Sequence, residues 1–247
     1  AVSSPAGPTV GGDTVILTGT GFSAAPATGA VQFGGATAIY IINSNTQITA
    51  IAPANAPGTY NIRVSTPGGA SAPATANMYT YVAAPTVTTV SPASGPSVGG
   101  TTVTIIGSGF AAAPGTGAVW FGGAAASYTI NSNTQITATA PANLVGNYHV
   151  TVTTPGGTSA TSGANQYSYL DVPVASSFTS AAVTYNASGV PLSLAGHATH
   201  APTNYAVGST TTAQGGSVAV DPAGLVMYFA PIGFRGNDSF TFTATNS

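Results

Sequence analysis

Short runs in which apolar and polar residues alternate, separated by Gly, Pro and Asn, make up most of the chain. Residues 148–153 form the clearest run, and similar runs lie at residues 102–106, 119–121, 136–140 and 167–169. Alternation with period two predicts β-strands, and runs that return at intervals of roughly ten residues are typical of a β-sandwich. No segment places apolar residues at the i, i+3, i+4 and i+7 positions of a helix, so we expect little or no helix.

One block of the chain occurs twice. Residues 9–82 (the first copy) recur as residues 97–170 (the second copy), at a constant offset of 88 and without a gap. A repeat of this length is a whole domain copied in tandem, and it leaves residues 171–247 as a third unit. We therefore predict three domains, at residues 1–83, 84–170 and 171–247.

The two copies share a specific pattern of glycine and apolar positions. In the second copy the pattern is Gly99-Gly100, Gly107-x-Gly109-Phe110, Val119-x-Phe121-Gly122-Gly123, Ala140-Pro141 and Gly146-x-Tyr148-x-Val150-x-Val152. The first copy repeats it as Gly11-Gly12, Gly19-x-Gly21-Phe22, Val31-x-Phe33-Gly34-Gly35, Ala52-Pro53 and Gly58-x-Tyr60-x-Ile62-x-Val64. This pattern resembles the IPT/TIG domain, the immunoglobulin-like fold of plexins, some transcription factors and many bacterial surface proteins. The resemblance implies two immunoglobulin-like sandwiches, with Phe22, Phe110, Val31 and Val119 in their cores.

The third unit follows another pattern, with Gly224, Tyr228 and Pro231 leading to the run Phe234-x-Gly236-x-Asp238-x-Phe240-x-Phe242. This ending resembles a cadherin-like or bacterial immunoglobulin-like domain. The fold class is therefore predicted as all-β, with three tandem immunoglobulin-like β-sandwich domains. Cadherin-type calcium sites use several carboxylates per ion, and this unit has three Asp and no Glu, so we expect no calcium-bridged junction.

Both ends of the chain differ from a complete sandwich. The second copy is preceded by a strand-like run at residues 85–90, whereas the first copy has only residues 1–4 before Pro5. The third unit ends soon after residues 240–244, where a further strand is expected. A missing strand leaves an unpaired sheet edge, which another chain can fill by β-augmentation.

Two interpretations fit these ends. The sequence is a piece of a longer protein with several repeats, or it is a subunit of a head-to-tail filament in which neighbours complete each other's sheets. Either interpretation predicts interfaces at the ends, with candidate residues Ala1, Val2, Phe240, Phe242 and Ala244.

Charge is almost absent. Two Arg, four Asp and no Lys or Glu amount to 2% charged residues, against about 25% in ordinary soluble domains. A net charge of −2 gives little mutual repulsion and favours association of the chain with itself. Nucleic-acid binding needs many basic residues and is not expected. The chain has no Cys and no apolar run of about 18 residues, so we expect neither disulfides nor membrane insertion.

The residue types that usually carry out chemistry are few and scattered. His197 and His200 lie three residues apart, but no third ligand accompanies them, so we expect no metal site and no cofactor. No Gly-x-Ser-x-Gly motif occurs, and four Asp spread over three domains do not suggest a carboxylate pair. We therefore expect no enzymatic activity. His149 lies at an outward position of a strand and is expected to face solvent.

Two further features concern contacts and modification. Trp120 replaces Gln32 of the first copy, and the alternation with Val119 and Phe121 turns it outward, toward a protein neighbour or a glycan. Asn186 and Asn237 begin Asn-x-Ser sequences and are candidate glycosylation sites.

These patterns predict a secreted or cell-surface structural protein. We expect an adhesive subunit that assembles with copies of itself into a surface filament, by donor-strand complementation between neighbours. The alternatives are a polysaccharide-binding accessory module of a larger secreted protein, with glycans as partners, and a phage fibre or decoration protein.

Overall fold

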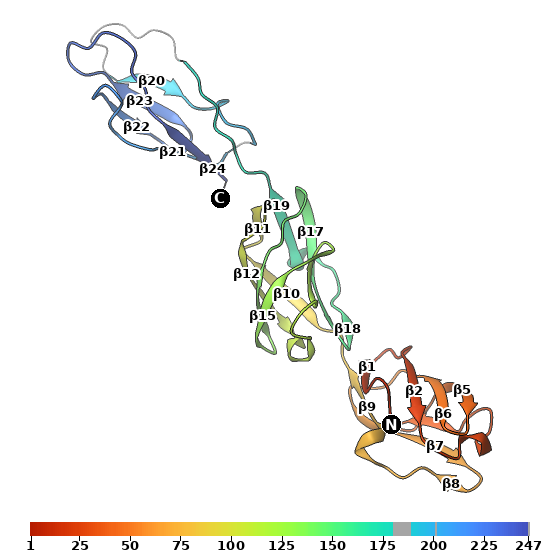
Figure 1. Ribbon diagram of the computed structural model, residues 1–247. Coiled ribbons are helices and arrows are strands. Elements are labelled where there is room, and N and C mark those ends of the chain that lie inside the picture. The colour runs from red at the N-terminus through yellow and green to blue at the C-terminus, as the bar shows by residue number, and fades with distance from the viewer. Residues whose placement is uncertain (180–188, 201, 247) are drawn as a thin grey trace. The chain divides into compact units, whose positions relative to one another are not determined.

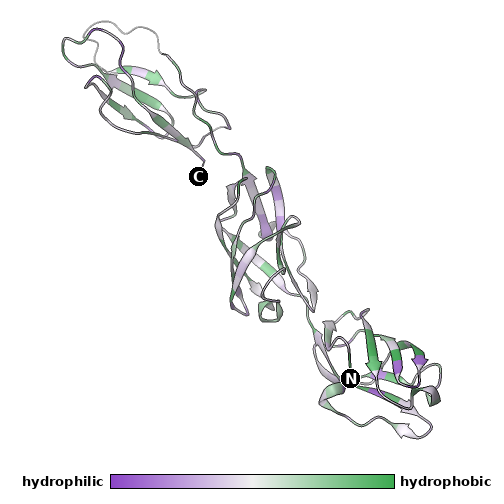
Figure 2. Ribbon diagram, in the orientation of Figure 1, coloured by the Kyte–Doolittle hydropathy of each residue, from purple (hydrophilic) through white to green (hydrophobic). Residues whose placement is uncertain are grey.

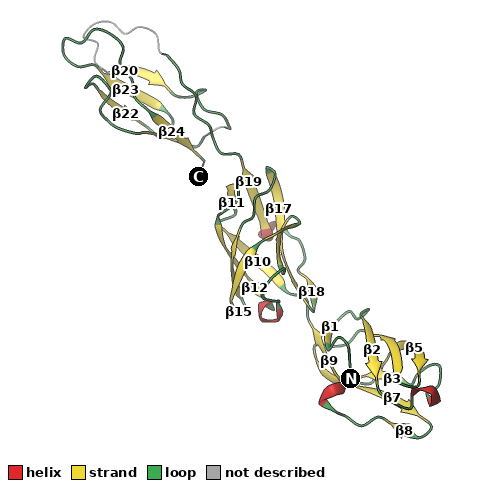
Figure 3. Ribbon diagram, viewed as in Figure 1, coloured by secondary structure: helices red, strands yellow, loops and turns green. Residues whose placement is uncertain are grey.

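The computed structural model describes residues 1–179, 189–200 and 202–246. Almost every regular element in these residues is a β-strand, which confirms the predicted all-β fold (Figures 1 and 3). The helices of the described residues are single 3₁₀ turns: η1 (Phe22–Ala24), η2 (Thr75–Asn77), η3 (Phe110–Ala112) and η4 (Gly163–Asn165). The chain divides into two compact units, Ala1–Tyr169 and Leu170–Ser247, which we call the N-terminal and C-terminal units.

The first copy is built from two sheets. One sheet has the strand order β2 (Thr14–Thr18), β6 (Gln47–Ile51) and β5 (Ile39–Ser44). The other has the order β1 (Ala6–Pro8), β9 (Met78–Val82), β7 (Gly58–Thr66), β3 (Val31–Phe33) and β4 (Ala36–Thr37), with β8 (Gly69–Ala70) on β7. Apolar side chains of both sheets, including Val15, Ile48, Phe33 and Tyr79, share one buried core. The alternating residues therefore close a sandwich, as their period predicts.

The second copy repeats this arrangement and has one additional strand, β10. Its first sheet has the order β10 (Thr86–Ser91), β12 (Thr102–Ser108), β16 (Gln135–Thr139) and β15 (Ser127–Ser132). Its second sheet has the order β11 (Ser94–Pro96), β19 (Gln166–Leu170), β17 (Gly146–Thr154), β13 (Val119–Phe121) and β14 (Ala124–Ala125), with β18 (Gly157–Thr158) on β17. Phe110 and Val119 are fully buried in its core, and Phe22 and Val31 are buried in the first copy, as expected.

The C-terminal unit carries two small sheets. Its strands have the orders β20 (Val190–Ser193), β23 (Leu225–Phe229), β22 (Ser217–Val220), and β21 (Asn204–Val207), β24 (Phe242–Thr245). Its buried core is small: Leu194, Tyr205, Val218 and Val226, with Phe178 and other half-buried side chains around them. The cadherin-like nature of this unit and the division of the chain into three domains stay predictions.

Candidate interaction surfaces

The first three residues occupy part of the place of β10. Val2 forms an antiparallel bridge with Leu17, as Val90 does with Ile105 in the second copy. The Thr18 N–H donates to the Ala1 carbonyl at 2.9 Å, and the Ser3 N–H donates to the Ile16 carbonyl at 3.0 Å. Ala1 and Val2, two of the predicted interface residues, therefore pair with the last residues of β2 along its free edge.

Beyond these residues the β2 edge is open. In the second copy, Thr86 and Val87 of β10 pair with Ser108 and Gly107. The corresponding residues of the first copy are Thr20 and Gly19, and the structure places no described strand beside them on this side. The Gly19 N–H donates to Thr46 on the opposite side at 3.0 Å, so backbone alternation turns the Thr20 N–H toward the open edge.

The predicted interface residues of the C-terminal unit lie close to its core. Phe240, Phe242 and Ala244 are half-buried and pack against the buried cluster of that unit. Phe242 and Ala244 belong to β24, and Phe240 precedes the strand, which is shorter than residues 240–244 suggested. Within the described residues β24 pairs only with β21, so its other backbone edge is without a strand partner.

Trp120 lies on the outer face of its sheet, as the alternation predicts. It is half-buried between fully buried Val119 and Phe121, and its strand neighbours are Thr151 and Ala125. The indole N–H donates to the Gly117 carbonyl at 3.2 Å, so the ring is held by its own loop.

His149 is less exposed than the sequence suggested. Its Nδ1 lies 2.9 Å from Oδ1 of Asn165, which is fully buried. The Asn165 amide nitrogen donates to the Ala160 carbonyl at 2.8 Å, which turns Oδ1 toward the ring and makes Nδ1–H the donor. The alternation of β17 could not show this contact, because Asn165 comes from the short helix η4 that covers the strand.

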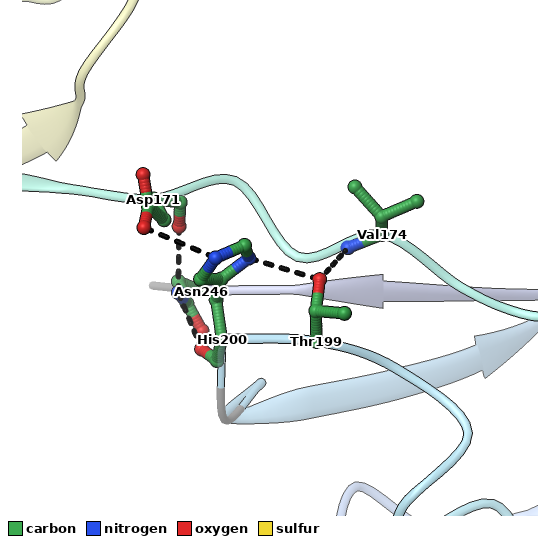
Figure 4. A network of polar contacts seen from close by, with 5 residues as sticks. All are labelled: Asp171, Val174, Thr199, His200 and Asn246. Carbon is green, nitrogen blue, oxygen red and sulfur yellow. Dashed lines mark hydrogen bonds and ion pairs between the residues drawn. The ribbon is translucent and has the colours of Figure 1, made fainter.

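The other two histidines take separate partners, and Figure 4 shows those of His200. His200 Nε2 lies 3.1 Å from Asp171 Oδ2, and its Nδ1 lies 2.9 Å from the Thr199 hydroxyl, which accepts the Val174 N–H. The His197 ring instead stacks on Phe178, with the centroids 4.1 Å apart.

The network around His200 holds the start of the C-terminal unit against its last strand. The Asn246 side chain donates to the carbonyls of Asp171 and His200 at 3.1 and 3.3 Å. The side chains of Asp171, His200 and Asn246 therefore have a structural role, which is to join these two segments. No group of three or more His, Asp or Glu suited to a metal ion occurs within residues 1–179, 189–200 and 202–246.

Sequence reasoning missed a cluster of hydrogen-bond donors around the carboxylate of Asp238. Its oxygens accept hydrogen bonds from the Thr212 hydroxyl, the Gln214 and Ser239 N–H groups and the Tyr228 hydroxyl. Burial alone would raise the pKa of Asp238, but these hydrogen bonds to the charged form outweigh it and lower the pKa. One Asp thereby ties the loop before β22 to β23 and to the segment before β24.

Acidification is expected to loosen the C-terminal unit through Asp238. A carboxyl whose pKa is lower in the folded state contributes stability above its unfolded pKa of about 4, and that contribution is lost as the pH falls through the folded value. Hydrogen exchange at β22 and β23, corrected for intrinsic rates, should speed up below about pH 4. Asp238→Asn should show faster exchange at pH 7 and little further change on acidification. Equal protection of the wild-type strands at pH 5 and pH 2.5 would contradict this role.

One candidate glycosylation site is exposed in the structure. Asn237 lies in the loop before Asp238 and its side chain is open to solvent. The Asn186 sequence lies outside the described residues. Among the described residues, no helix is long and apolar enough to cross a membrane.

Comparison with known proteins identifies the repeated block. The family model for the IPT/TIG domain matches residues 1–81 and 85–169. No curated protein sequence matches the chain.

Several solved structures are similar, at low identity. The plexin A4 extracellular region is 18% identical, with coverage of 100% of this chain and 22% of that one, at a TM-score of 0.43. The bacterial integrin-binding protein invasin is 14% identical, with coverage of 100% and 58%, at a TM-score of 0.36. SGBP-B from a xyloglucan utilization locus of Bacteroides uniformis is 20% identical, with coverage of 73% and 56%, at a TM-score of 0.31. The chain thus spans less than two thirds of each of these proteins.

Proposed function

Because the chain belongs to the IPT/TIG domain family, we propose that it is an extracellular structural and adhesive protein whose subunits join end to end. Its activity is assembly and not catalysis, and its location is the cell surface or the surrounding medium. The tandem sandwiches act as spacers held by packing alone, since the chain has no Cys. A chain of net charge −2 presents little electrostatic barrier to its own association.

The open β2 edge is the observation that carries this proposal. The second copy pairs this edge along the whole of β10, which shows that the fold accepts a full strand there. In the first copy, residues 1–3 pair with this edge only as far as Thr18, and among the described residues no strand lies beside the Thr20 N–H. A strand from another chain that enters here gains main-chain hydrogen bonds by β-augmentation.

A second open edge supplies the complementary end. β24 lies in the C-terminal unit and pairs only with β21 among the described strands. A contact between the β2 edge of one molecule and the β24 edge of the next molecule is heterologous, because different surfaces meet. Such contacts generate an open filament when the rotation does not close.

The filament is tested by blocking the open edge. Thr20→Pro removes the N–H that points to this edge and leaves the bond from Gly19 to Thr46 in place, so strand addition should fail. Thr20→Ala keeps the N–H and serves as the matched control. We expect elongated particles in negative-stain images and in sedimentation for wild type and Thr20→Ala, and at least about tenfold fewer for Thr20→Pro.

A carbohydrate-binding role is the second candidate, favoured by the partly exposed ring of Trp120 on the outer face of β13. If wild type forms only discrete single particles and is retained on insoluble polysaccharide, and if Trp120→Ala abolishes that retention, the filament proposal is wrong and the glycan-binding one is supported.

A further inference from the structure

The outer face of the sheet β2–β6–β5 in the first copy carries four exposed isoleucines. The exposed fractions are 38% for Ile16, 79% for Ile39, 68% for Ile41 and 37% for Ile51. The inward residues of the same strands, such as Val15 and the other core residues, already fill the sandwich. The four isoleucines are therefore additional to the core. In Figure 2 the strands β2 and β5 are largely in the hydrophobic colour.

The strand register makes these side chains one patch, which we call the isoleucine face. Ile39 pairs directly with Ile51 across β5 and β6. Ile41 and Ile16 both pair with Thr49, one from each side. Side chains at paired and diagonal positions on one face of a sheet lie within contact distance, so the four form a continuous surface. They expose on the order of 400 Å², a size typical of the largest apolar patch on a soluble monomer, which is often functional.

The second copy shows that the fold does not require this face. At the corresponding positions it has Thr104, Ser127, Thr129 and Thr139, on strands with the same pairing. Its outer face keeps a single exposed isoleucine, Ile106, where the first copy has Thr18. The same backbone is thus built with a polar face in one copy and an apolar face in the other. Folding requirements are shared by the two copies, so they do not explain the difference.

We propose that the isoleucine face is a homotypic contact, in which two chains pack this face of their first copies against each other about a two-fold axis. The contact is a sheet-on-sheet packing of β-branched side chains, like that inside a β-sandwich. It goes beyond the end-to-end joining proposed above, because it joins chains side by side and uses a face instead of a strand edge.

The chemistry of the face favours the same face of another molecule of this chain as its partner. The charged side chains of the first copy are turned elsewhere: Asp13 accepts a hydrogen bond from Tyr79, and Arg63 lies on β7 of the other sheet. A charged partner would find no counter-charge on the face, whereas a second uncharged isoleucine face would need none. Two such faces with their polar rims bury on the order of 1,000 Å², which suits a weak, concentration-dependent dimer.

The internal repeat supplies the variants that test this contact. The face-swap variant Ile16→Thr, Ile39→Ser, Ile41→Thr, Ile51→Thr gives the first copy the residues that the second copy already carries in the same fold. The comparison uses a chain that carries Thr20→Pro, with and without the face-swap, so that end-to-end joining does not contribute. We expect the Thr20→Pro chain to dimerise at about 10–100 μM in sedimentation equilibrium, and the face-swap to weaken this at least about tenfold.

The reverse swap sharpens the result. Thr104→Ile, Ser127→Ile, Thr129→Ile and Thr139→Ile place the face on the second copy and should increase association. Circular dichroism of each variant verifies the fold. A Thr20→Pro chain that stays monomeric at a few hundred micromolar would overturn the proposal, as would a folded face-swap variant with unchanged dimerisation. The effect of Thr20→Pro on filaments tests only the end-to-end joining. The side-by-side dimer is measured separately, through the face-swap.

Discussion

Replacing Gly99 with alanine is expected to destabilise the second copy by about 2–5 kcal/mol, against about 1 kcal/mol for the same change at its neighbour Gly100. Both glycines have a positive φ, 78° for Gly99 and 91° for Gly100, so each substitution carries a backbone strain. Only Gly99 lacks room. A Cβ there would lie 2.6 Å from the backbone of Pro141 and Ala142, whereas one at Gly100 meets nothing within 4 Å.

The backbone contact makes the clash at Gly99 hard to relieve. Its neighbours are main-chain atoms of the segment that follows β16, and the adjacent Gly100 N–H donates to Ala140 there at 2.9 Å. Moving this segment would break that hydrogen bond. Gly11 and Gly12 repeat the contrast in the first copy, where a Cβ at Gly11 would lie 2.5 Å from the Ala52 carbonyl oxygen.

Trp120 gives this prediction a specific readout, because it is the single Trp of the chain and lies in the second copy. Denaturation of the full chain followed by its fluorescence should show a lower midpoint for Gly99→Ala than for Gly100→Ala. The pair Gly11→Ala and Gly12→Ala controls for the site, since changes in the first copy should leave the Trp120 transition nearly unmoved. Equal losses for the two second-copy variants would refute the steric explanation.

Pattern and repeat predicted the fold because both are local signals. The period-two runs at 102–106, 119–121 and 167–169 became β12, β13 and β19, and most of the shared glycines have a positive φ. The alternation also turned Trp120 outward correctly. These properties depend on the residue and its immediate neighbours, so one sequence is enough to read them.

Contacts between distant segments could not be read in this way. Asn165 reaches His149 only because a short helix crosses the strand, and Asp238 gathers donors from Thr212 and Tyr228, which lie on separate segments. The isoleucine face also needed the strand register, since Ile16 and Ile39 are far apart in the chain and meet only through β6. Alignment of the two copies contained the signal, because it sets each isoleucine beside a Ser or Thr.

The buried tyrosines of the two sandwiches form matched clusters. Tyr81 stands edge-on to Tyr79 with ring centroids 4.9 Å apart, and Tyr169 stands in the same way to Tyr167 at 5.0 Å. All four are at most 1% exposed. The Tyr79 hydroxyl donates to Asp13, whereas the hydroxyls of Tyr81 and Tyr169 have no hydrogen-bond partner among the described residues.

Alkaline pH is therefore expected to unfold both sandwiches. Burial first, and then the nearby Tyr60, raises the pKa of Tyr81 to about 12; burial, Tyr167 and Tyr148 raise the pKa of Tyr169 to about 12. A phenol with a raised folded pKa contributes stability that is complete below the unfolded value of 10.0 and is lost as the pH rises toward 12. The melting temperature should fall by roughly 10 °C or more between pH 9 and pH 11.5.

Tyrosinate absorbance and circular dichroism recorded on the same samples measure this loss. Ionisation of the buried tyrosines should coincide with loss of β-structure. The double variant Tyr81→Phe, Tyr169→Phe is the control: it removes two unpaired buried hydroxyls, so it should be at least as stable as wild type at pH 7 and lose less stability on alkalinisation. If every tyrosine ionised near pH 10 while the β-structure remained, the clusters would not hold their phenols neutral in the way their burial requires.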